Sequence, residues 1–268
     1  MARLITSYRG ETLTLAATGS IGFAQVRNIP PGMNVLEVHP VSATIEALLL
    51  AFGPKILRVF LHRPATSTAL ARFIDLTDAL VDRNTASLSP LSGMASTDFL
   101  YVCLAQSARG LAVDVSDANA IAAVATWSYL DVADTWTSLS ATDGTASGGA
   151  TLAVDGLVTW TVPNPALWVS RELPVSLGAP FPARGYWLRL TVDATLTLPT
   201  TLGELSALAN INVDTLTARS EGQARVRIPS HNSTRAPDRF PLSAEYGSVE
   251  ITSTTIVTAI YLNWYHEI

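Results

Sequence analysis

The stretch YWLRLTV, residues 186–192, alternates between two kinds of position along its whole length. Its even-numbered positions are all apolar or aromatic, whereas its odd-numbered positions hold Trp187, Arg189 and Thr191. Successive side chains of a β-strand point to opposite faces of a sheet, so this pattern predicts a strand with one face buried. The stretch is the clearest indication of the fold class. Shorter runs with the same alternation of apolar and polar residues occur along the chain.

The other alternating runs are short and are separated by turn-forming residues. Alternation recurs at residues 36–39, 57–62, 111–115, 158–162 and 224–228, and the run 249–265 is rich in Thr, Ile, Val and aromatic residues. Turn-forming pairs such as Asp143-Gly144 and Asp155-Gly156 lie between them. Helical segments are expected only at residues 74–82 and 119–124. The sequence therefore predicts an all-β protein whose antiparallel sheets pack as a sandwich.

Two joints rich in turn-forming residues, at positions 63–68 and 198–201, divide the chain. They predict an N-terminal β segment over residues 1–65, a central sandwich over residues 66–199 and a C-terminal β segment over residues 200–268. Each outer segment offers only a small core of its own. We therefore expect that the two outer segments could pack with each other.

The composition excludes several classes of protein. Of the 268 residues, 48% are hydrophobic and 15% are charged, which is the opposite of the composition of a disordered chain. The net charge of −5 argues against a general nucleic-acid binder, although it is compatible with a small basic patch. We expect a folded protein that does not bind nucleic acid.

The single cysteine, Cys103, excludes an intrachain disulfide and a thiolate zinc cluster. It lies in the apolar run FLYVCL, residues 99–104, which predicts a buried and unreactive thiol. No apolar run reaches the roughly 18 residues of a membrane span, and the N-terminus has no signal-peptide core. We therefore expect synthesis in a reducing cytoplasm and no membrane partner.

The central block carries an ordered series of aromatic and turn motifs. In chain order they are WSY (127–129), WTSL (136–139), DGT (143–145), GLVTWTVP (156–163) and GYWLR (185–189). This order resembles a jelly-roll β-sandwich domain of virion structural proteins from tailed bacteriophages and prophages, over about residues 70–195. The resemblance implies a jelly roll in a capsid decoration protein or a tail protein.

The tryptophans of the block have two possible uses. Packing in the core or on a sheet surface is expected, rather than stacking on sugars, for Trp127, Trp136, Trp160 and Trp187. Trp187 shares a strand face with Arg189, and if that face is exposed the pair could anchor an interface. Further arginines lie on the C-terminal segment, which we interpret either as a solvated loop or as a docking element. The candidate interface residues are Trp187, Arg189, Arg225, Arg227, Arg235 and Arg239.

No catalytic, cofactor-binding or metal-binding motif is found in the sequence. The histidines at positions 39, 62, 231 and 266 have no metal-ligand spacing, and His39 and His62 are expected as a surface pair on neighbouring strands. There is no nucleophile elbow, phosphate-binding loop or dinucleotide fingerprint. The oxygen-rich segment 114–119 could offer ligands to calcium, but a turn is favoured. We therefore expect no enzyme and no cofactor.

Three functions are compatible with these sequence features. The first is a capsid decoration (cement) protein that binds the major capsid protein and forms a homo-oligomer, with a trimer preferred. The second is a tail or baseplate protein. The third is a carbohydrate-binding module for adhesion to a host. In the first two cases the protein would be made in the bacterial host cytoplasm and would reside in the virion.

Overall fold

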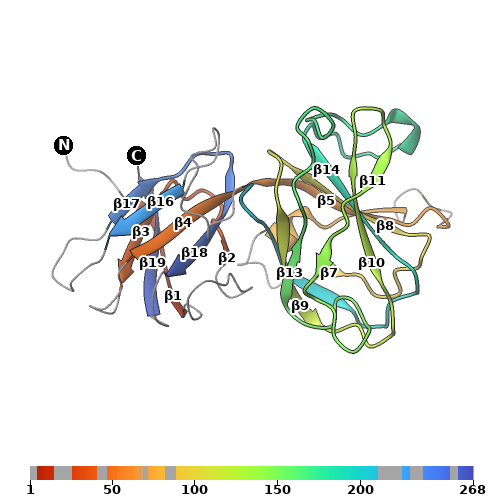
Figure 1. Cartoon of the computed structure of the whole chain (residues 1–268), viewed down its shortest axis with the longest axis horizontal. Helices are drawn as coiled ribbons and strands as arrows, with labels where there is room; N and C mark the ends of the chain where they lie inside the picture. The colour runs from red at the N-terminus through yellow and green to blue at the C-terminus, as the bar shows by residue number, and fades with distance from the viewer. Residues whose placement is uncertain are drawn as a thin grey trace. The chain divides into compact units, whose positions relative to one another are not determined.

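The computed structural model describes residues 5–14, 26–40, 47–66, 68, 72–81, 89–210, 225–229, 238–253 and 259–267 (Figure 1). Within these residues the regular structure consists of β-strands, the short helix α2 (Thr77–Val81) and the 3-10 turn η2 (Val175–Leu177). Neighbouring strands pair in antiparallel fashion. The predicted all-β class and its sandwich-like character are confirmed.

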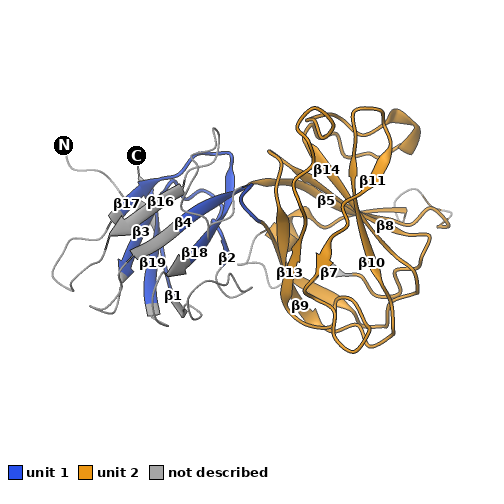
Figure 2. Cartoon of the chain, in the orientation of Figure 1, with its two compact units in different colours: residues 1–53, 208–268 blue, residues 54–207 orange. Residues whose placement is uncertain are grey.

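The chain divides into two compact units (Figure 2). Residues Met1–Gly53 and Leu208–Ile268 form one unit, here called the terminal unit, and Pro54–Ala207 form the central unit. These boundaries differ from the expected ones at 65/66 and 199/200. The reason is strand pairing: β5 (Ile56–His62) pairs with β8 (Phe99–Leu104), and β15 (Thr201–Ala207) pairs with β9 (Gly110–Asp117).

The central unit contains two sheets. The larger has the strand order β11-β10-β14-β8-β5-β6, and the smaller has the order β12-β13-β9-β15-β7. The strands not yet introduced are β6 (Phe73–Asp75), β7 (Ser89–Pro90), β10 (Ala125–Leu130), β11 (Trp136–Ser138), β12 (Thr142–Asp143), β13 (Gly156–Thr159) and β14 (Tyr186–Val192). The alternating stretch 186–192 is thus an inner strand, β14, of the larger sheet.

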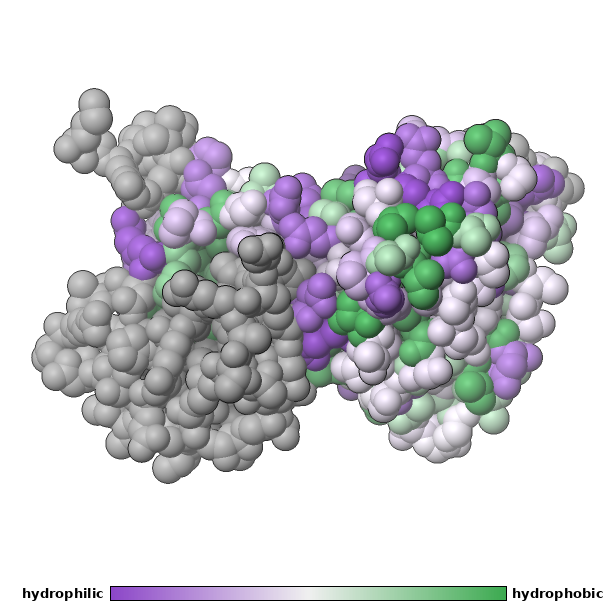
Figure 3. Space-filling view, turned by 45° about the horizontal axis from the view of Figure 1, so that its top comes forward, coloured by the Kyte–Doolittle hydropathy of each residue, from purple (hydrophilic) through white to green (hydrophobic). Residues whose placement is uncertain are grey.

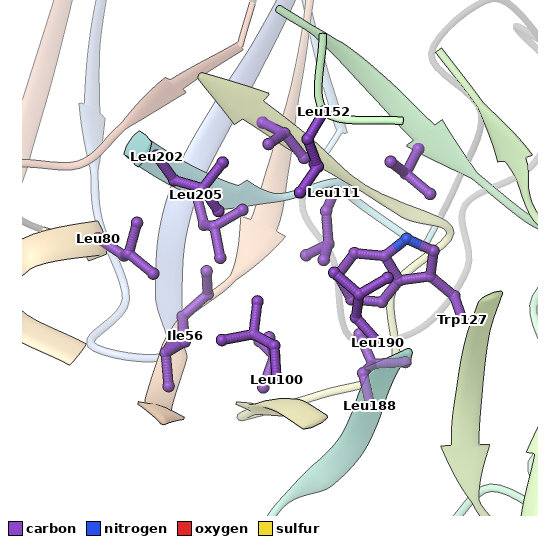
Figure 4. Close-up of a cluster of buried hydrophobic side chains, with 14 of the residues drawn as sticks. Ile56, Leu80, Leu100, Leu111, Trp127, Leu152, Leu188, Leu190, Leu202 and Leu205 are labelled. Carbon is purple, nitrogen blue, oxygen red and sulfur yellow. The ribbon is translucent and has the colours of Figure 1, made fainter. Parts of the chain in front are cut away.

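An apolar core joins these two sheets (Figure 4). Leu188 and Leu190 of β14 belong to the same buried cluster as Leu111 of β9. Trp127 and Trp160 lie in this cluster with ring centroids 6.4 Å apart. Because each large buried side chain contributes about 1.5–3 kcal/mol, this cluster is the main source of stability of the central unit.

The outer face of the six-stranded sheet carries a second buried cluster. Phe60 lies at its centre, with ring centroids 4.9 Å from Tyr101 and 6.0 Å from Trp187. The segment 171–185 covers this cluster, and Phe181 contributes a ring 5.4 Å from that of Phe60. The sheet is therefore apolar on both faces over part of its width.

The two expected helices have different outcomes. Helix α2 (Thr77–Val81) lies inside the expected range 74–82, after strand β6. The segment 119–124 is a loop rather than a helix. The side chain of Asn119 bonds to the backbone of Ile121 through both its oxygen and its nitrogen, and such local bonds compete with helical ones.

The terminal unit also has two sheets, drawn from both ends of the sequence. One has the order β1-β19-β3-β17 and the other β16-β4-β18-β2. Their bounds are β1 (Ile5–Thr14), β2 (Val26–Asn28), β3 (Val35–Pro40), β4 (Ala47–Pro54), β16 (Arg225–Pro229), β17 (Asp238–Pro241), β18 (Tyr246–Ser253) and β19 (Ala259–Glu267). Buried Leu36, Phe52 and Trp264 belong to its apolar core.

Candidate functional site

Trp187 does not lie on an exposed face, although it shares the face of Arg189 as expected. Its side chain is fully buried, and the indole Nε1 donates a hydrogen bond to the carbonyl oxygen of Arg171 at 3.0 Å. The cause is the segment 171–185, which covers this part of the sheet. Trp187 is a structural residue that holds this segment in place.

Arg189 lies beside the second cluster between two aromatic rings. Its guanidinium carbon is 4.7 Å from the ring centroid of Trp136 and 5.1 Å from that of Phe99. Burial lowers the pKa of Arg189, yet a guanidinium keeps its charge at neutral pH. The residue therefore links β14 to the adjacent strand β8 and to the edge strand β11 through cation–π contacts.

The C-terminal arginines of the candidate interface do not lie together on one strand. Arg225 and Arg227 belong to strand β16, which confirms the alternating run there as a strand, and Arg235 lies outside the described residues. Arg239 lies on β17, where its Nε donates to Glu37 Oε2 at 2.8 Å. Its guanidinium carbon also lies 5.4 Å from the ring centroid of Tyr265.

Arg239 belongs to a polar network on one face of the sheet β1-β19-β3-β17. The network consists of Glu37, His39, Arg239, Asn263 and Tyr265. Glu37 Oε1 accepts from Tyr265 Oη at 3.2 Å and lies 2.5 Å from His39 Nε2. Asn263 Nδ2 lies 2.9 Å from His39 Nε2 and 3.5 Å from Glu37 Oε1. We call this group the Glu37 network.

Alternation along β3 and the pairing of its neighbouring strands bring these side chains together. On β3, Leu36 and Val38 point into the core, so Glu37 and His39 point to the other face. Strand pairing then places Asn263 opposite Glu37, and Tyr261 opposite His39. The same pairing places Arg239 opposite Glu37 on the other side.

The Glu37 carboxyl is buried, and its surroundings favour the charged form. Burial alone raises the pKa of Glu37, but hydrogen bonds from Arg239, His39, Asn263 and Tyr265 outweigh it and lower the pKa below its ordinary value. A carboxylate that accepts several hydrogen bonds is stabilised in this way. Glu37 is therefore a fixed acceptor that orients the side chains around it.

A hollow of about 550 Å³ lies beside the Glu37 network. Its lining residues are Gly10, Glu11, Thr12, His39, Tyr261 and Asn263, from strands β1, β3 and β19. Gly10 pairs with Asn263 and contributes no side chain to this face, whereas the Tyr261 side chain is 49% exposed. The arrangement combines an exposed ring with hydroxyl, amide and imidazole groups, which suits a small polar ligand.

His39 and His62 do not form the expected surface pair, because they belong to different units. His62 lies on β5 in the central unit, is buried, and stacks on Phe73 with ring centroids 4.4 Å apart. Burial lowers the pKa of His62, as does the positive charge of Arg72. His62 is therefore part of the aromatic packing.

The segment 114–119 is not the expected turn, because residues 114–117 are the end of strand β9 and pair with β15. Asp117 accepts from the Thr201 hydroxyl at 2.6 Å, and Asn119 bonds to backbone groups of neighbouring loops. Among the described residues, no group of three or more His, Cys, Asp or Glu side chains is placed to hold a metal ion.

No pattern in the sequence predicts the hollow. Of the described candidate interface residues, only Arg239 belongs to the Glu37 network beside it. Thr12, His39 and Tyr261 are far apart in the chain, and only the sheet order brings them together. The available signal is the polar side of the alternation at residues 36–39.

Comparison with known proteins gives no family for the chain. No protein-family model matches it, and no curated protein is significantly similar to it. Within the described part of the chain, no helix combines the length and the apolar character needed to cross a membrane.

Proposed function

We propose that this chain is a structural protein of a tailed-bacteriophage particle, a capsid decoration protein built on a jelly-roll sandwich. It would be made in the bacterial host cytoplasm, assemble as a homo-oligomer, preferably a trimer, and bind the major capsid protein. The proposal rests on the resemblance of the motif series in residues 70–195 to such domains. One observation supports that interpretation: the motif residues are framework residues of the central unit.

The tryptophans of the series have packing roles. Trp127 and Trp160 lie stacked in the main core, and Trp160 Nε1 donates to the carbonyl oxygen of Ala108 at 2.8 Å. Trp136 packs against the outer cluster and contacts Arg189. Conventional aromatic binding platforms leave their rings exposed, whereas Trp127 and Trp160 are buried and Trp136 is partly buried, which favours a scaffold over a sugar-binding use of this series.

The turn and glycine residues of the series are also structural. Asp143 Oδ1 accepts from the backbone N–H of Thr145 at 2.9 Å, which closes the DGT turn. A Cβ added at Gly156 would lie 2.1 Å from the Gly144 carbonyl oxygen, and one at Gly185 would lie 2.4 Å from the Leu104 oxygen. Only glycine permits these close backbone approaches.

Exposed apolar side chains on the central unit provide surface for subunit contacts. Green apolar patches interrupt the surface of this unit in Figure 3. Ile121, Val124 and Leu198 are 43%, 61% and 77% exposed. The loops that carry them are joined, because the Ala120 N–H donates to Thr197 Oγ1 at 3.1 Å. Exposed apolar side chains on adjoining loops offer surface for a protein–protein interface.

The test has two parts. Antibodies against the purified chain are applied to phage particles released by the bacterium that carries the gene, and their position is determined by electron microscopy. We expect labelling of the head. Labelling of the tail or baseplate would replace decoration by the second function, and absence of the chain from purified particles would overturn the proposal.

The oligomer is tested by light scattering of the purified full chain. We expect three times the chain mass, and dissociation in the double variant Ile121→Asp/Val124→Asp. The control Val175→Asp changes a side chain that is 96% exposed on a different loop and should leave the trimer intact. A monomeric wild-type chain would contradict the proposed assembly.

A further inference from the structure

We propose that the hollow beside the Glu37 network binds a neutral saccharide unit. This site goes beyond the proposed role in the particle and does not depend on it. It lies in the terminal unit, far in sequence from the tryptophan series of the central unit. Four features of the hollow favour such a ligand: its size, its exposed ring, its oriented polar groups and its charge balance.

The size and position of the hollow suit one or two sugar rings. Its volume of about 550 Å³ falls within the roughly 300–1,000 Å³ of small-molecule sites. The floor is formed by paired strands, since β19 lies between β1 and β3. Sites built on inner strands hold their side chains more firmly than sites on loops.

Tyr261 supplies the apolar contact that sugar rings need. Strand pairing places it between Thr12 on β1 and His39 on β3. Tyr261 is 49% exposed although it lies on a strand between two neighbours. A tyrosine ring offers an apolar face for the C–H groups of a sugar and a hydroxyl for hydrogen bonding.

The Glu37 network holds the polar groups of the hollow in place before a ligand binds. The Asn263 amide and the His39 imidazole both contact Glu37 Oε1, and they also contact each other at 2.9 Å. Tyr265 and Arg239 fix the same carboxylate from other directions. Groups oriented in advance lose less conformational entropy on binding, which favours affinity.

The charges at the hollow favour a neutral ligand. Among the described residues, two carboxylates lie near it and each has an arginine partner: Glu37 pairs with Arg239 at 2.8 Å and Glu11 with Arg27 at 3.6 Å. A phosphate or carboxylate ligand would require an additional cation, whereas sugar hydroxyls both donate and accept hydrogen bonds. A hydroxyl-rich neutral ligand therefore matches the site better than an anion.

The test uses the full-length chain and saturation-transfer NMR with glucose, galactose, rhamnose and N-acetylglucosamine, together with sialic acid as an anionic probe. We expect a signal from at least one neutral sugar and none from sialic acid. A panel of neutral oligosaccharides then gives the dissociation constant by titration calorimetry. No neutral ligand at about 10 mM, or a preference for the anion, would overturn the proposal.

Two variants locate the binding in the hollow. Tyr261→Ala removes the ring, and we expect an affinity loss of about tenfold or more. Gly10→Val places a side chain into the hollow on a strand that tolerates β-branched residues, and should abolish binding while the unfolding midpoint is kept. Val175→Ala, in the central unit, is the control and should bind as the wild type does. Unchanged binding in both site variants would refute the assignment.

Discussion

At the scale of single residues, Trp187 shows how a covering segment changes the role of a side chain. Alternation places it correctly beside Arg189, but the segment 171–185 closes over it and accepts its indole hydrogen bond through Arg171. A large ring in this position contributes through packing and not through contact with partners. Its substitution should therefore change stability first.

Trp187→Ala is expected to lower the free energy of unfolding of the central unit by about 3–5 kcal/mol, because it leaves a large cavity and removes the bond to Arg171. Urea unfolding followed by circular dichroism measures the change. The control Val175→Ala removes an exposed side chain and should stay within about 0.5 kcal/mol of wild type. Equal midpoints for the two variants would contradict the buried position.

Cys103 should be unreactive in the folded protein. Burial raises the pKa of its thiol to about 12, so almost no thiolate exists at neutral pH. We expect no reaction with an aromatic disulfide reagent at pH 8, and one equivalent of reaction after unfolding in guanidinium. Rapid labelling of the native chain would show that the FLYVCL strand is accessible.

Glu37 should make the terminal unit sensitive to acid. Its pKa in the folded state lies below the ordinary value of 4.5, so the stabilisation is present above that value and is lost as the pH falls through the folded-state pKa. We expect Glu37→Gln to reduce the dependence of unfolding on pH below about 5, measured by urea titrations at several pH values. Asp75 and Asp131 titrate in both proteins and serve as the common background. Parallel curves would contradict this role of Glu37.

At the scale of elements, the sequence predicts strands well and a loop poorly. Strand β14 follows directly from the alternation at 186–192, because a half-buried strand demands that pattern. The segment 119–124 is expected to be a helix, but Asn119 uses its side chain to tie three loops together. Such long-range bonds leave no periodic trace in the sequence, so this loop could not be predicted.

Asn119→Ala tests this arrangement of loops. The side chain is 2% exposed; its Nδ2 donates to the oxygens of Ile121 and Thr151, and its Oδ1 accepts from Thr197. Its loss leaves buried groups without partners and should cost on the order of 3 kcal/mol. Asn164→Ala is the matched control, since Asn164 is exposed and bonds locally to Ala166. Urea unfolding should separate the two variants, and similar costs would contradict the bridging role.

At the scale of the whole molecule, each unit has its own core. The main cluster of the central unit draws only on residues between Ile56 and Ala207, and that of the terminal unit only on residues outside this range. The sequence indicates a central sandwich and two outer β segments. The exact joints and the hollow depend on which strands pair, which local patterns do not encode.

The fragment 54–207 should therefore fold without the rest of the chain. We expect a β-type circular dichroism spectrum, dispersed amide resonances and cooperative unfolding, because both of its sheets and its core lie inside the fragment. The fragment 1–53 is the comparison and should show no cooperative transition, since β1 and β3 lack β19 between them. An unfolded central fragment would show that its core is insufficient.

The position of β19 has a consequence for the order of events on the ribosome. The strand lies between β1 and β3, yet it is translated after both of them and after the entire central unit. The nascent chain thus carries two early strands whose shared neighbour does not yet exist, while the unit translated next already has every strand it needs. The sheet that holds β1 and β3 is completed only when β19 has been translated, and the interval exposes strand edges that chaperones can occupy.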